Sequence, residues 1–585
     1  MISPEEAVWI SCDILVIGAG AAGLTAACRA AEKGAAVVLA VKGSCGKTGV
    51  RGSGASCCGA TEYGVPGFPK LAKDSLRDGR LYEAIIGAGL GITDPELAKT
   101  LVEKIPEAER QCETWGVRWG LSGSETLGYP LARALFPVLK KRVKIIENIF
   151  VFDIILDENG ICAGAAAVLE NDPVLIEAKA VIIASGGIAG IYEVNVHPPC
   201  VTGDGLAMAL RAGAKLKNME FAQFFPVTVF PQRNLFHFWN KRGIGNIKNR
   251  YGKEFLRDYL PPDITPDQCA GENLSHAPFS TRDSASRYLA IGIMKEILKG
   301  NAGSHGGVFA DLRGQNDDGG FSGAAGDGNA AERQRAFLLS RGIDIERELV
   351  ELGMGFQCGS GGIEIDKNGC TGVPGLYAAG EAACGMYGAD RIGGTMLASC
   401  VVWGLLSSEH AAEYSRRRAR EKKAALKNRI TDQLPDLFEN PGFREGSAET
   451  FAAEKNRGEE PGIKKRLKHG AWKYLSVIKT ESGIKKILLE TGEAAGERVS
   501  GGKTAGEKIE LKNQILITAC VAESALSRKE SRGSFYREDF PDMDPGVPVY
   551  GSKLFLDNGK IRTETCIPDK TWQGGGTAIA LKRWG

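Results

Sequence analysis

The alternation of apolar and polar positions near the N-terminus predicts a strand, a turn and a helix in close succession. Residues 13–17 are mostly apolar and lead directly into Gly18-x-Gly20-x-x-Gly23, and a helix is expected over Leu24–Lys33, followed by a second strand over Ala36–Val41. Glycines at these three positions permit a tight turn, a close approach of the backbone to a pyrophosphate, and close packing of helix on strand. The pattern predicts a βαβ unit that binds a dinucleotide.

Two further strand-and-glycine units occur later in the chain. One covers residues 180–190 and follows a predicted hairpin of strands 145–156 and 161–169, and the other covers residues 375–381. Between them, residues 191–345 have a mixed pattern with long loops. We therefore predict a dinucleotide-binding domain that is split by an inserted second domain.

After Trp403 the glycine signal fades and helical periodicity predicts a separate helical lobe, with helices over 405–426, 464–489 and 511–527. The fold class expected is α/β: a Rossmann-like domain split by an α+β capping domain and followed by a helical domain. The predicted division is 1–190 and 346–412 for the dinucleotide-binding domain, 191–345 for the capping domain, 413–545 for the helical domain and 546–585 for a C-terminal extension.

Composition narrows the class of protein. The 585 residues exceed the size of one hydrophobic core, and a net charge of only +2 gives no overall field that favours nucleic acid or anionic membrane. The 77 glycines suggest backbone pressed against a large ligand at several points. With neither a basic signal-like start nor a long apolar run, we expect a cytoplasmic protein without a membrane span, and any attachment to a membrane would be through a partner.

The 15 cysteines are interpreted as reduced thiols, and none forms CxxC or a metal-binding cluster. We expect no metal on this chain, so any iron-sulfur centre must belong to another chain. The vicinal pair Cys57-Cys58 could be redox active, although two small buried residues are the simpler interpretation.

Five motifs in order carry a resemblance that covers nearly the whole chain. They are Gly18–Gly23, Ala184–Gly190, Thr202–Gly205, Glu381 with Arg391-Ile-Gly-Gly, and Glu530–Pro541. Together they resemble the succinate dehydrogenase and fumarate reductase flavoprotein family, which includes L-aspartate oxidase and the adenylylsulfate reductase flavoprotein.

The resemblance implies FAD bound in an extended form between the dinucleotide-binding and capping domains. By matching positions, the implied cofactor contacts are Gly18, Gly20, Gly23, Lys42, Gly186, Asp204, Glu381, Arg391 and Leu397. Lys42 could alternatively be a solvated strand end. Some family members attach the flavin through a histidine, but the matching position here is Ser53, so a non-covalent FAD is expected.

The resemblance also implies catalytic residues. Arg282 matches an arginine that gives a proton to the substrate carbon while hydride moves at flavin N5, and Arg391 would bind a substrate carboxylate with both nitrogens. Arginine is intrinsically a poor proton donor, so an ion-paired arginine in the capping domain is the alternative for Arg282. Asp283 could orient it or cap the following helix.

Departures from the family pattern bear on the substrate. Phe225 and Gln357 stand where the family has histidines, and a Thr-Glu pair falls on His237 and Phe238. Losing such hydrogen-bonding partners costs orders of magnitude in rate, so efficient turnover of fumarate or succinate is not expected. His237 could contact substrate, relay a proton or simply pack. A cluster of aromatic residues could line a more apolar pocket or form the core of the cap: Phe224, Phe225, Phe230, Phe236, Phe238 and Trp239.

Two functions from different classes remain. The first is an FAD oxidoreductase that reduces C=C or dehydrogenates CH-CH in a less polar substrate and exchanges electrons with an iron-sulfur partner. The second is a non-catalytic flavin electron-transfer subunit of a larger redox complex. A third possibility, amine oxidation resembling that of L-aspartate oxidase, is disfavoured because the same contacts to a diacid are missing. The basic run 416–423 is either a solvated helix face or a dock for an acidic electron carrier.

Overall fold

A computed structural model of the chain describes a large part of it. The described residues are 7–43, 80–118, 128–170, 172–231, 235–236, 246–269, 285–313, 336, 338–420, 462–496, 504–543 and 549–566.

The N-terminal βαβ unit forms as predicted. β1 (Val8–Ile17) and β2 (Val37–Val41) pair in parallel, with Leu15 opposite Val38, and α1 (Ala21–Glu32) connects them. Every residue of β2 is buried, which is typical of a parallel strand covered on both faces.

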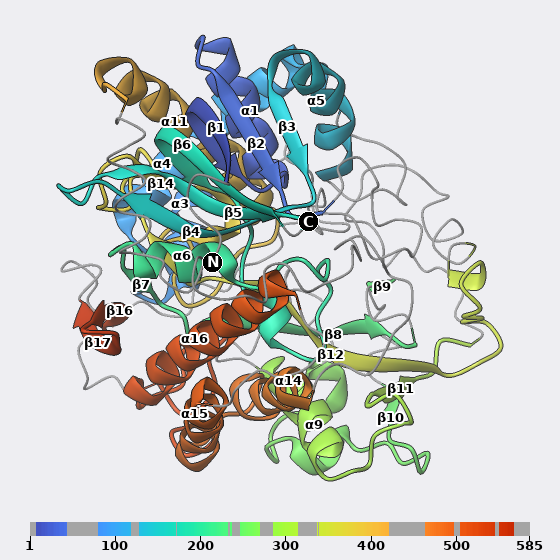
Figure 1. The fold of residues 1–585 in the computed structure, drawn as a ribbon. Helices are drawn as coiled ribbons and strands as arrows, with labels where there is room; N and C mark the ends of the chain where they lie inside the picture. The colour runs from blue at the N-terminus through green and yellow to red at the C-terminus, as the bar shows by residue number, and fades with distance from the viewer. Residues whose placement is uncertain are drawn as a thin grey trace.

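This unit lies within a seven-stranded sheet with strand order β3-β2-β1-β6-β5-β4, and β14 pairs with the carboxyl end of β6 (Figure 1). The pairs β2–β3, β1–β2, β1–β6 and β6–β14 are parallel, so these strands end at one edge of the sheet. The added strands are β3 (Lys144–Glu147), β4 (Ile149–Leu156), β5 (Cys162–Leu169), β6 (Asp172–Ile183) and β14 (Leu376–Ala378).

The predicted strand over 145–156 is wrong as a single element. Asn148 has a φ of 56°, in the left-handed region, and separates β3, parallel to β2, from β4, antiparallel to β5. The predicted hairpin is confirmed, with the turn at Asp157–Gly160 connecting β4 to β5.

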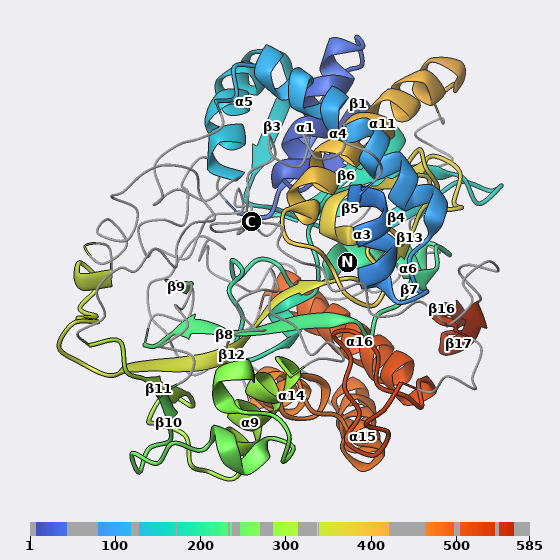
Figure 2. The same cartoon turned by 180° about the vertical axis from the view of Figure 1, so that it is seen from behind.

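Helices cover the sheet, and α1, α4 and α11 lie together on one face of it (Figure 2). Helix α11 begins earlier than predicted, at Thr395, and packs on α1, where a Cβ at Gly404 would lie 2.8 Å from Thr25 Cβ. Helix α11 therefore belongs to the helical layer that covers the seven-stranded sheet, and it is not the start of the helical lobe. The helices of this part are α3 (Arg80–Gly89), α4 (Pro95–Thr114), α5 (Gly128–Arg142) and α11 (Thr395–Arg417).

A second, antiparallel sheet has the order β10-β11-β12-β8-β9, and α9 packs against it. Its elements are β8 (Ala222–Val229), β9 (Leu235–Phe236), β10 (Ile247–Lys248), η3 (Leu256–Tyr259), α9 (Arg287–Leu298), β11 (Val308–Ala310) and β12 (Val350–Gly359). These strands lie within the predicted capping domain and the residues that directly follow it.

A third sheet, with order β15-β13-β7-β16-β17, brings together distant parts of the chain. Its strands are β7 (Leu216–Lys217), β13 (Gly362–Glu364), β15 (Ala383–Cys384), β16 (Gly551–Asp557) and β17 (Lys560–Cys566). Short helical segments complete this part of the fold: η2 (Ala189–Ile191), α6 (Asp204–Arg211) and η4 (Gly380–Ala382).

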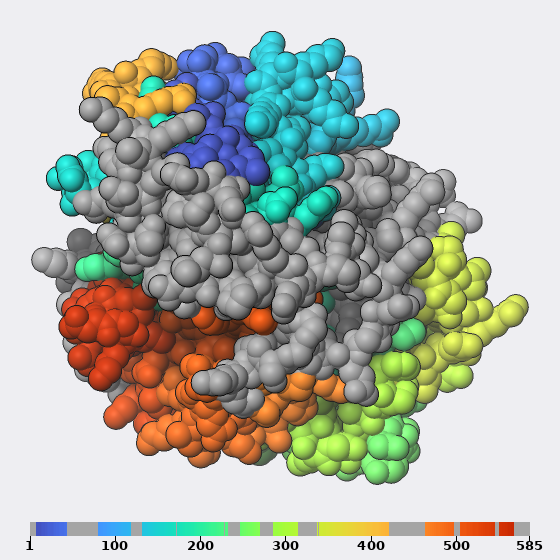
Figure 3. Space-filling view, in the orientation of Figure 1, coloured from blue at the N-terminus to red at the C-terminus, as the bar shows by residue number. Residues whose placement is uncertain are grey.

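The C-terminal helices are α14 (Gly462–Leu475), α15 (Glu481–Gly496) and α16 (Ala505–Ser527), coloured orange to red in Figures 1 and 3. The helix predicted over 464–489 is thus two helices that pack against each other. Thr504 and Glu507 start α16 with a reciprocal capping box. None of the helices that the structure describes is both long and apolar enough to cross a membrane. The predicted fold class is confirmed, while the domain boundaries stay predictions.

Candidate cofactor and active site

The carboxyl ends of four parallel strands meet around one cavity. Gly18 follows β1, Lys42 follows β2, Gly186 lies just after β6, and Glu381 lies just after β14. All four residues line the cavity, together with Gly20, Asp204 and Leu397. In open parallel sheets this edge is where ligands bind. Seven of the predicted cofactor contacts thus line the same cavity.

The three motif glycines have the separate geometries that the motif requires. Gly18 has a φ of +103°, and a Cβ there would lie 2.4 Å from the Ala184 carbonyl oxygen. A Cβ at Gly23 would lie 1.9 Å from the Gly18 oxygen, so Gly23 packs α1 onto the turn and does not line the cavity. A Cβ at Gly20 would meet nothing within 4 Å, and no side chain caps α1 there. The backbone N–H groups at the start of α1 are therefore available to an anion.

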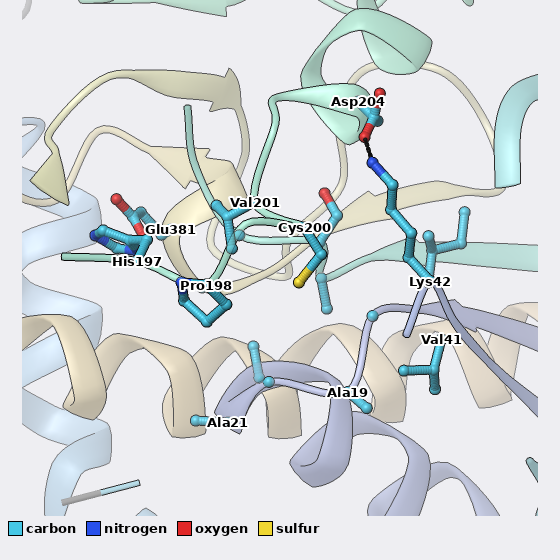
Figure 4. Close-up of a pocket in the computed structure, with 18 of the residues that line it drawn as sticks. Ala19, Ala21, Val41, Lys42, His197, Pro198, Cys200, Val201, Asp204 and Glu381 are labelled. Carbon is cyan, nitrogen blue, oxygen red and sulfur yellow. Dashed lines mark hydrogen bonds and ion pairs between the residues drawn. The ribbon is translucent and has the colours of Figure 1, made fainter. Parts of the chain in front are cut away.

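At one end of the cavity Lys42 forms a compact ionic cluster, of which Figure 4 shows the ion pair with Asp204. Its Nζ lies 2.8 Å from Asp204 Oδ2 and 2.6 Å from Glu510 Oε2, and it donates to Thr202 Oγ1 at 2.8 Å. Burial would lower the pKa of Lys42, but the two carboxylates outweigh it and raise that pKa. The alternative of a solvated strand end for Lys42 is therefore wrong.

The helical lobe completes this cluster. Burial raises the pKa of Glu510, but Lys42 and Lys464 outweigh burial and lower that pKa to about 2. Asn513 Nδ2 donates to Asp204 Oδ1 at 2.7 Å, one helical turn from Glu510 on α16. Lys464 from α14 lies 2.9 Å from Glu510 Oε1. Both carboxylates that hold Lys42 are thus themselves held by the helical lobe.

The other end of the cavity is formed by Glu381, His197 and Gln357. Figure 4 shows His197 beside Glu381, at the far side of the cavity from Lys42. His197 Nε2 contacts the Gln357 carbonyl oxygen, and His197 Nδ1 lies 3.9 Å from Glu381 Oε2. Glu381 Oε1 accepts from the Gly359 N–H at 3.1 Å. This end joins the loop after β6, the turn η4 and strand β12.

Arg391 is 1 % exposed and lies immediately behind this end of the cavity. Its Nη2 donates to Gln357 Oε1 at 3.1 Å, and its Nε lies 3.3 Å from Gln223 Oε1 and 3.1 Å from Cys358 Sγ. Gln223 also donates to Asp390, so a buried polar network orients the guanidinium. Gln357 and Cys358 line the cavity, whereas Arg391 and Gly23 are not among its described lining residues.

The C-terminal signature Glu530–Pro541 supports the segment that leads to Arg391. Ser534 donates to the Ala389 carbonyl oxygen through both its N–H, at 3.0 Å, and its Oγ, at 2.9 Å. A Cβ at Gly533, where φ is +56°, would lie 2.6 Å from the same oxygen. The signature therefore holds the backbone two residues before Arg391.

Three of the aromatic residues pack in the capping sheet. Phe224 lies 5.1 Å from Tyr192 and 5.7 Å from Phe356 between ring centroids, and Phe225 and Phe230 are also buried. These three are not among the described residues that line the cavity. For them the core interpretation is correct. The side chain of Phe236, and all of His237, Phe238 and Trp239, lie outside the described residues.

Other predicted residues also lie outside the described part of the chain, namely Arg282, Asp283, Ser53, Cys57 and Cys58. Sequence reasoning missed His197, Glu510 and Cys358. His197 had one usable signal, a histidine in the short loop between two glycine motifs. Glu510 and Cys358 had none, because their partners are distant in sequence.

The basic run is only partly a solvated face. Arg416 is exposed, and Arg417 is exposed and pairs with Glu413. Arg418 Nη2 lies 2.9 Å from Asp157 Oδ2, which ties the residue after α11 to the turn between β4 and β5. Residues 421–423 lie outside the described residues.

A parallel sheet with a cavity at its carboxyl edge and an uncapped helix start define a dinucleotide-binding protein with a capping sheet. Residues 13–397 match a family model for the FAD binding domain, and residues 464–550 match one for the fumarate reductase flavoprotein C-terminus. The chain belongs to the succinate dehydrogenase and fumarate reductase flavoprotein family. It is an FAD oxidoreductase of this type, and FAD is its cofactor.

Relatives match over nearly their full lengths. A chain of the CoM/CoB fumarate reductase of Methanothermobacter marburgensis is 28% identical, over 92% of this chain and 96% of the relative. L-aspartate oxidase of Yersinia pestis is 27% identical, over 91% of this chain and 96% of the relative. A solved structure of Escherichia coli quinol fumarate reductase has a TM-score of 0.75 at 24% identity and covers 97% of this chain and 100% of that chain, which supports the fold.

Proposed function

We propose that the protein transfers hydride between flavin N5 and an organic substrate, by C=C reduction or CH-CH dehydrogenation, and that this substrate is less polar than fumarate or succinate. One observation carries the proposal about substrate. Gln357 stands where the family has a substrate histidine, and its amide oxygen accepts from the guanidinium of Arg391. Phe225, at the other such position, is buried in the capping sheet. Two polar contacts to a small diacid are thereby replaced.

The described residues fit an extended FAD. The start of α1 at Gly20 is open to a pyrophosphate, and the residue after β2 in such folds approaches the adenosine ribose. We assign the adenosine half to the end near Lys42 and Asp204 and the flavin half to the end near Glu381. Gly18, Gly186 and Leu397 would contact the cofactor between them.

FAD, when bound, supplies hydride transfer at N5. The protein's part is to bind and orient the substrate and to move a proton. Arg391, buried directly behind Gln357 and Cys358 of the cavity wall, is the proposed partner of a substrate carbonyl or carboxylate oxygen, where it would stabilise developing negative charge. Arg282 is the proposed proton donor to the substrate carbon, and His237 a proposed substrate contact.

We further propose an iron-sulfur partner that exchanges electrons with the flavin. None of the 15 cysteines forms a CxxC motif, so such a centre would belong to another chain. The exposed Arg416 and the basic residues after it are the proposed contact for an acidic carrier. A cytoplasmic protein, peripheral to a membrane only through this partner, is consistent with the proposal.

The test is anaerobic reoxidation of the reduced flavin. We expect fumarate to reoxidise it about 100-fold more slowly than a less polar enoate does. Gln357→His should raise the rate with fumarate and leave that with the enoate, whereas Gln111→His, on α4 and outside the cavity lining, should change neither. Rapid reoxidation of the wild-type protein by fumarate would refute the proposed substrate class.

The electron-transfer alternative gives a different result in the same experiment. A relay subunit would be reoxidised by a one-electron acceptor and by no enoate, and Arg282→Ala would leave that electron flow intact. Loss of enoate reoxidation in Arg282→Ala, with FAD content and one-electron oxidation unchanged, supports catalysis.

A further inference from the structure

His197 lies at the proposed flavin end of the cavity, and no catalytic or cofactor role is implied for it by the motifs. It is 8 % exposed, and its backbone N–H donates to Asn195 Oδ1 at 3.0 Å, which holds the loop in place. The Phe356 ring lies 5.7 Å from the imidazole between centroids. His197 is thus packed on the cavity wall between the Gln357 backbone and the Phe356 ring.

The contacts of the two ring nitrogens differ in kind. The Gln357 carbonyl oxygen can only accept, so Nε2 must carry a hydrogen. Nδ1 faces Glu381 Oε2 at 3.9 Å, which is too long for a hydrogen bond and short enough for an ion pair. Because the Nε2 hydrogen is already in place, binding of one proton at Nδ1 converts the ring directly to an imidazolium.

Among the described residues, Glu381 of η4 is the charged group in contact with this histidine, β12 supplies the Gln357 carbonyl oxygen, and the guanidinium of Arg391 lies behind Gln357. Glu381 Oε2 is thus the carboxylate oxygen that faces Nδ1, and the Arg391 guanidinium lies on the far side of Gln357.

We propose that His197 is a proton-binding and positioning residue of the flavin site, whose protonation follows the redox state of the bound cofactor. When the FAD takes up two electrons and one proton at N5, its ring system carries a negative charge. A second proton, from solvent, then binds His197 Nδ1 and balances that charge beside Glu381. On oxidation by an electron carrier the electrons leave and both protons return to solvent, whereas on oxidation by substrate the N5 hydrogen leaves as hydride and only the His197 proton returns to solvent. The inference needs FAD binding, which the family establishes, and does not depend on the identity of the substrate.

The test is a redox titration of the bound FAD at several pH values between about 6 and 8, where imidazole ordinarily titrates. From the pH dependence of the potential, we expect reduction of the wild-type protein to take up two protons for two electrons. Reduction of His197→Asn should take up one proton for two electrons. The matched control is His305→Asn, because His305 Nδ1 pairs with Glu351 at 2.7 Å in the capping sheet, away from the cavity. The control should keep two protons.

An unchanged ratio in His197→Asn would overturn the proposal. If that variant fails to retain FAD, His197→Gln and the wild-type protein labelled with ¹³C-histidine provide a second test. With 6 histidines in the chain, the spectrum is simple enough to follow each ring. The His197 signal should shift to the imidazolium position on reduction at neutral pH. A spectrum in which no histidine changes charge on reduction would likewise overturn it.

Discussion

Replacing Lys479 by methionine should stabilise the protein and remove one contribution to the pH dependence of its unfolding free energy. Lys479 is 1 % exposed, its Nζ donates to the Ser476 carbonyl oxygen, and it lies 4.8 Å from the Phe535 ring centroid. Burial, with a contribution from Arg537, lowers its pKa from 10.5 to about 7, although Glu220 acts in the opposite direction. The folded protein therefore carries an ammonium group at a free-energy cost at and below neutral pH.

The magnitude follows from the two pKa values. A tenfold change in proton affinity is worth about 1.4 kcal/mol, so the difference between 10.5 and about 7 amounts to about 5 kcal/mol of unfolding free energy. The unfolded chain binds the extra proton between these values, so wild-type stability rises with pH across this interval. The cost is present in full below about pH 7 and disappears as the pH approaches 10.5.

The assay is urea unfolding of wild type and Lys479→Met with FAD saturating, at several pH values from about 6.5 to 9.5. Losing the hydrogen bond to Ser476 costs about 1 kcal/mol, so the variant should gain about 4 kcal/mol at the lowest pH. The gain should shrink by about 1.4 kcal/mol for each pH unit above 7. The exposed Lys99→Met is the control and should show no such trend. A variant that is less stable than wild type at every pH, with a constant difference, would refute the reasoning.

Three further substitutions test the site. Gly23→Ala places a Cβ 1.9 Å from the Gly18 carbonyl oxygen, so we expect the variant to lose FAD and roughly 3 kcal/mol of unfolding free energy. Gly87→Ala, where a Cβ would meet nothing within 4 Å, is the control. Normal FAD content in Gly23→Ala would contradict the packing role. Glu510→Gln should cost about 3 kcal/mol at pH 7, and the difference from wild type should vanish as the pH falls toward 2, because the depressed pKa stabilises only above that range. An FAD affinity unchanged by Glu510→Gln would show that the helical lobe does not support the adenosine end. Gly533→Ala forces a Cβ to 2.6 Å from the Ala389 oxygen and should weaken substrate binding while FAD content is retained. The measurement is the change in KM compared with the change in kcat. Unchanged kinetics would show that this contact does not support the active site.

Local sequence was enough to predict the cofactor-binding unit. Gly18 has a left-handed φ of +103° in the turn, and Gly23 packs against the Gly18 oxygen five residues away, so these requirements arise within the turn itself. Periodicity likewise identified the parallel sheet and the C-terminal helices. It failed at Asn148 and after Leu475, because a single left-handed residue or a short bend leaves the apolar pattern unbroken.

The packing of the lobes, by contrast, sets which charges and polar groups meet at the site. Lys42 was a predicted cofactor contact, but its partner Glu510 lies on a helix of another lobe, and no local pattern links the two. The same holds for His197, which reaches a carbonyl 160 residues away on β12. Ion pairs and hydrogen bonds depend on atomic distances that arise when lobes pack, whereas turns and periodic faces depend on neighbours along the chain.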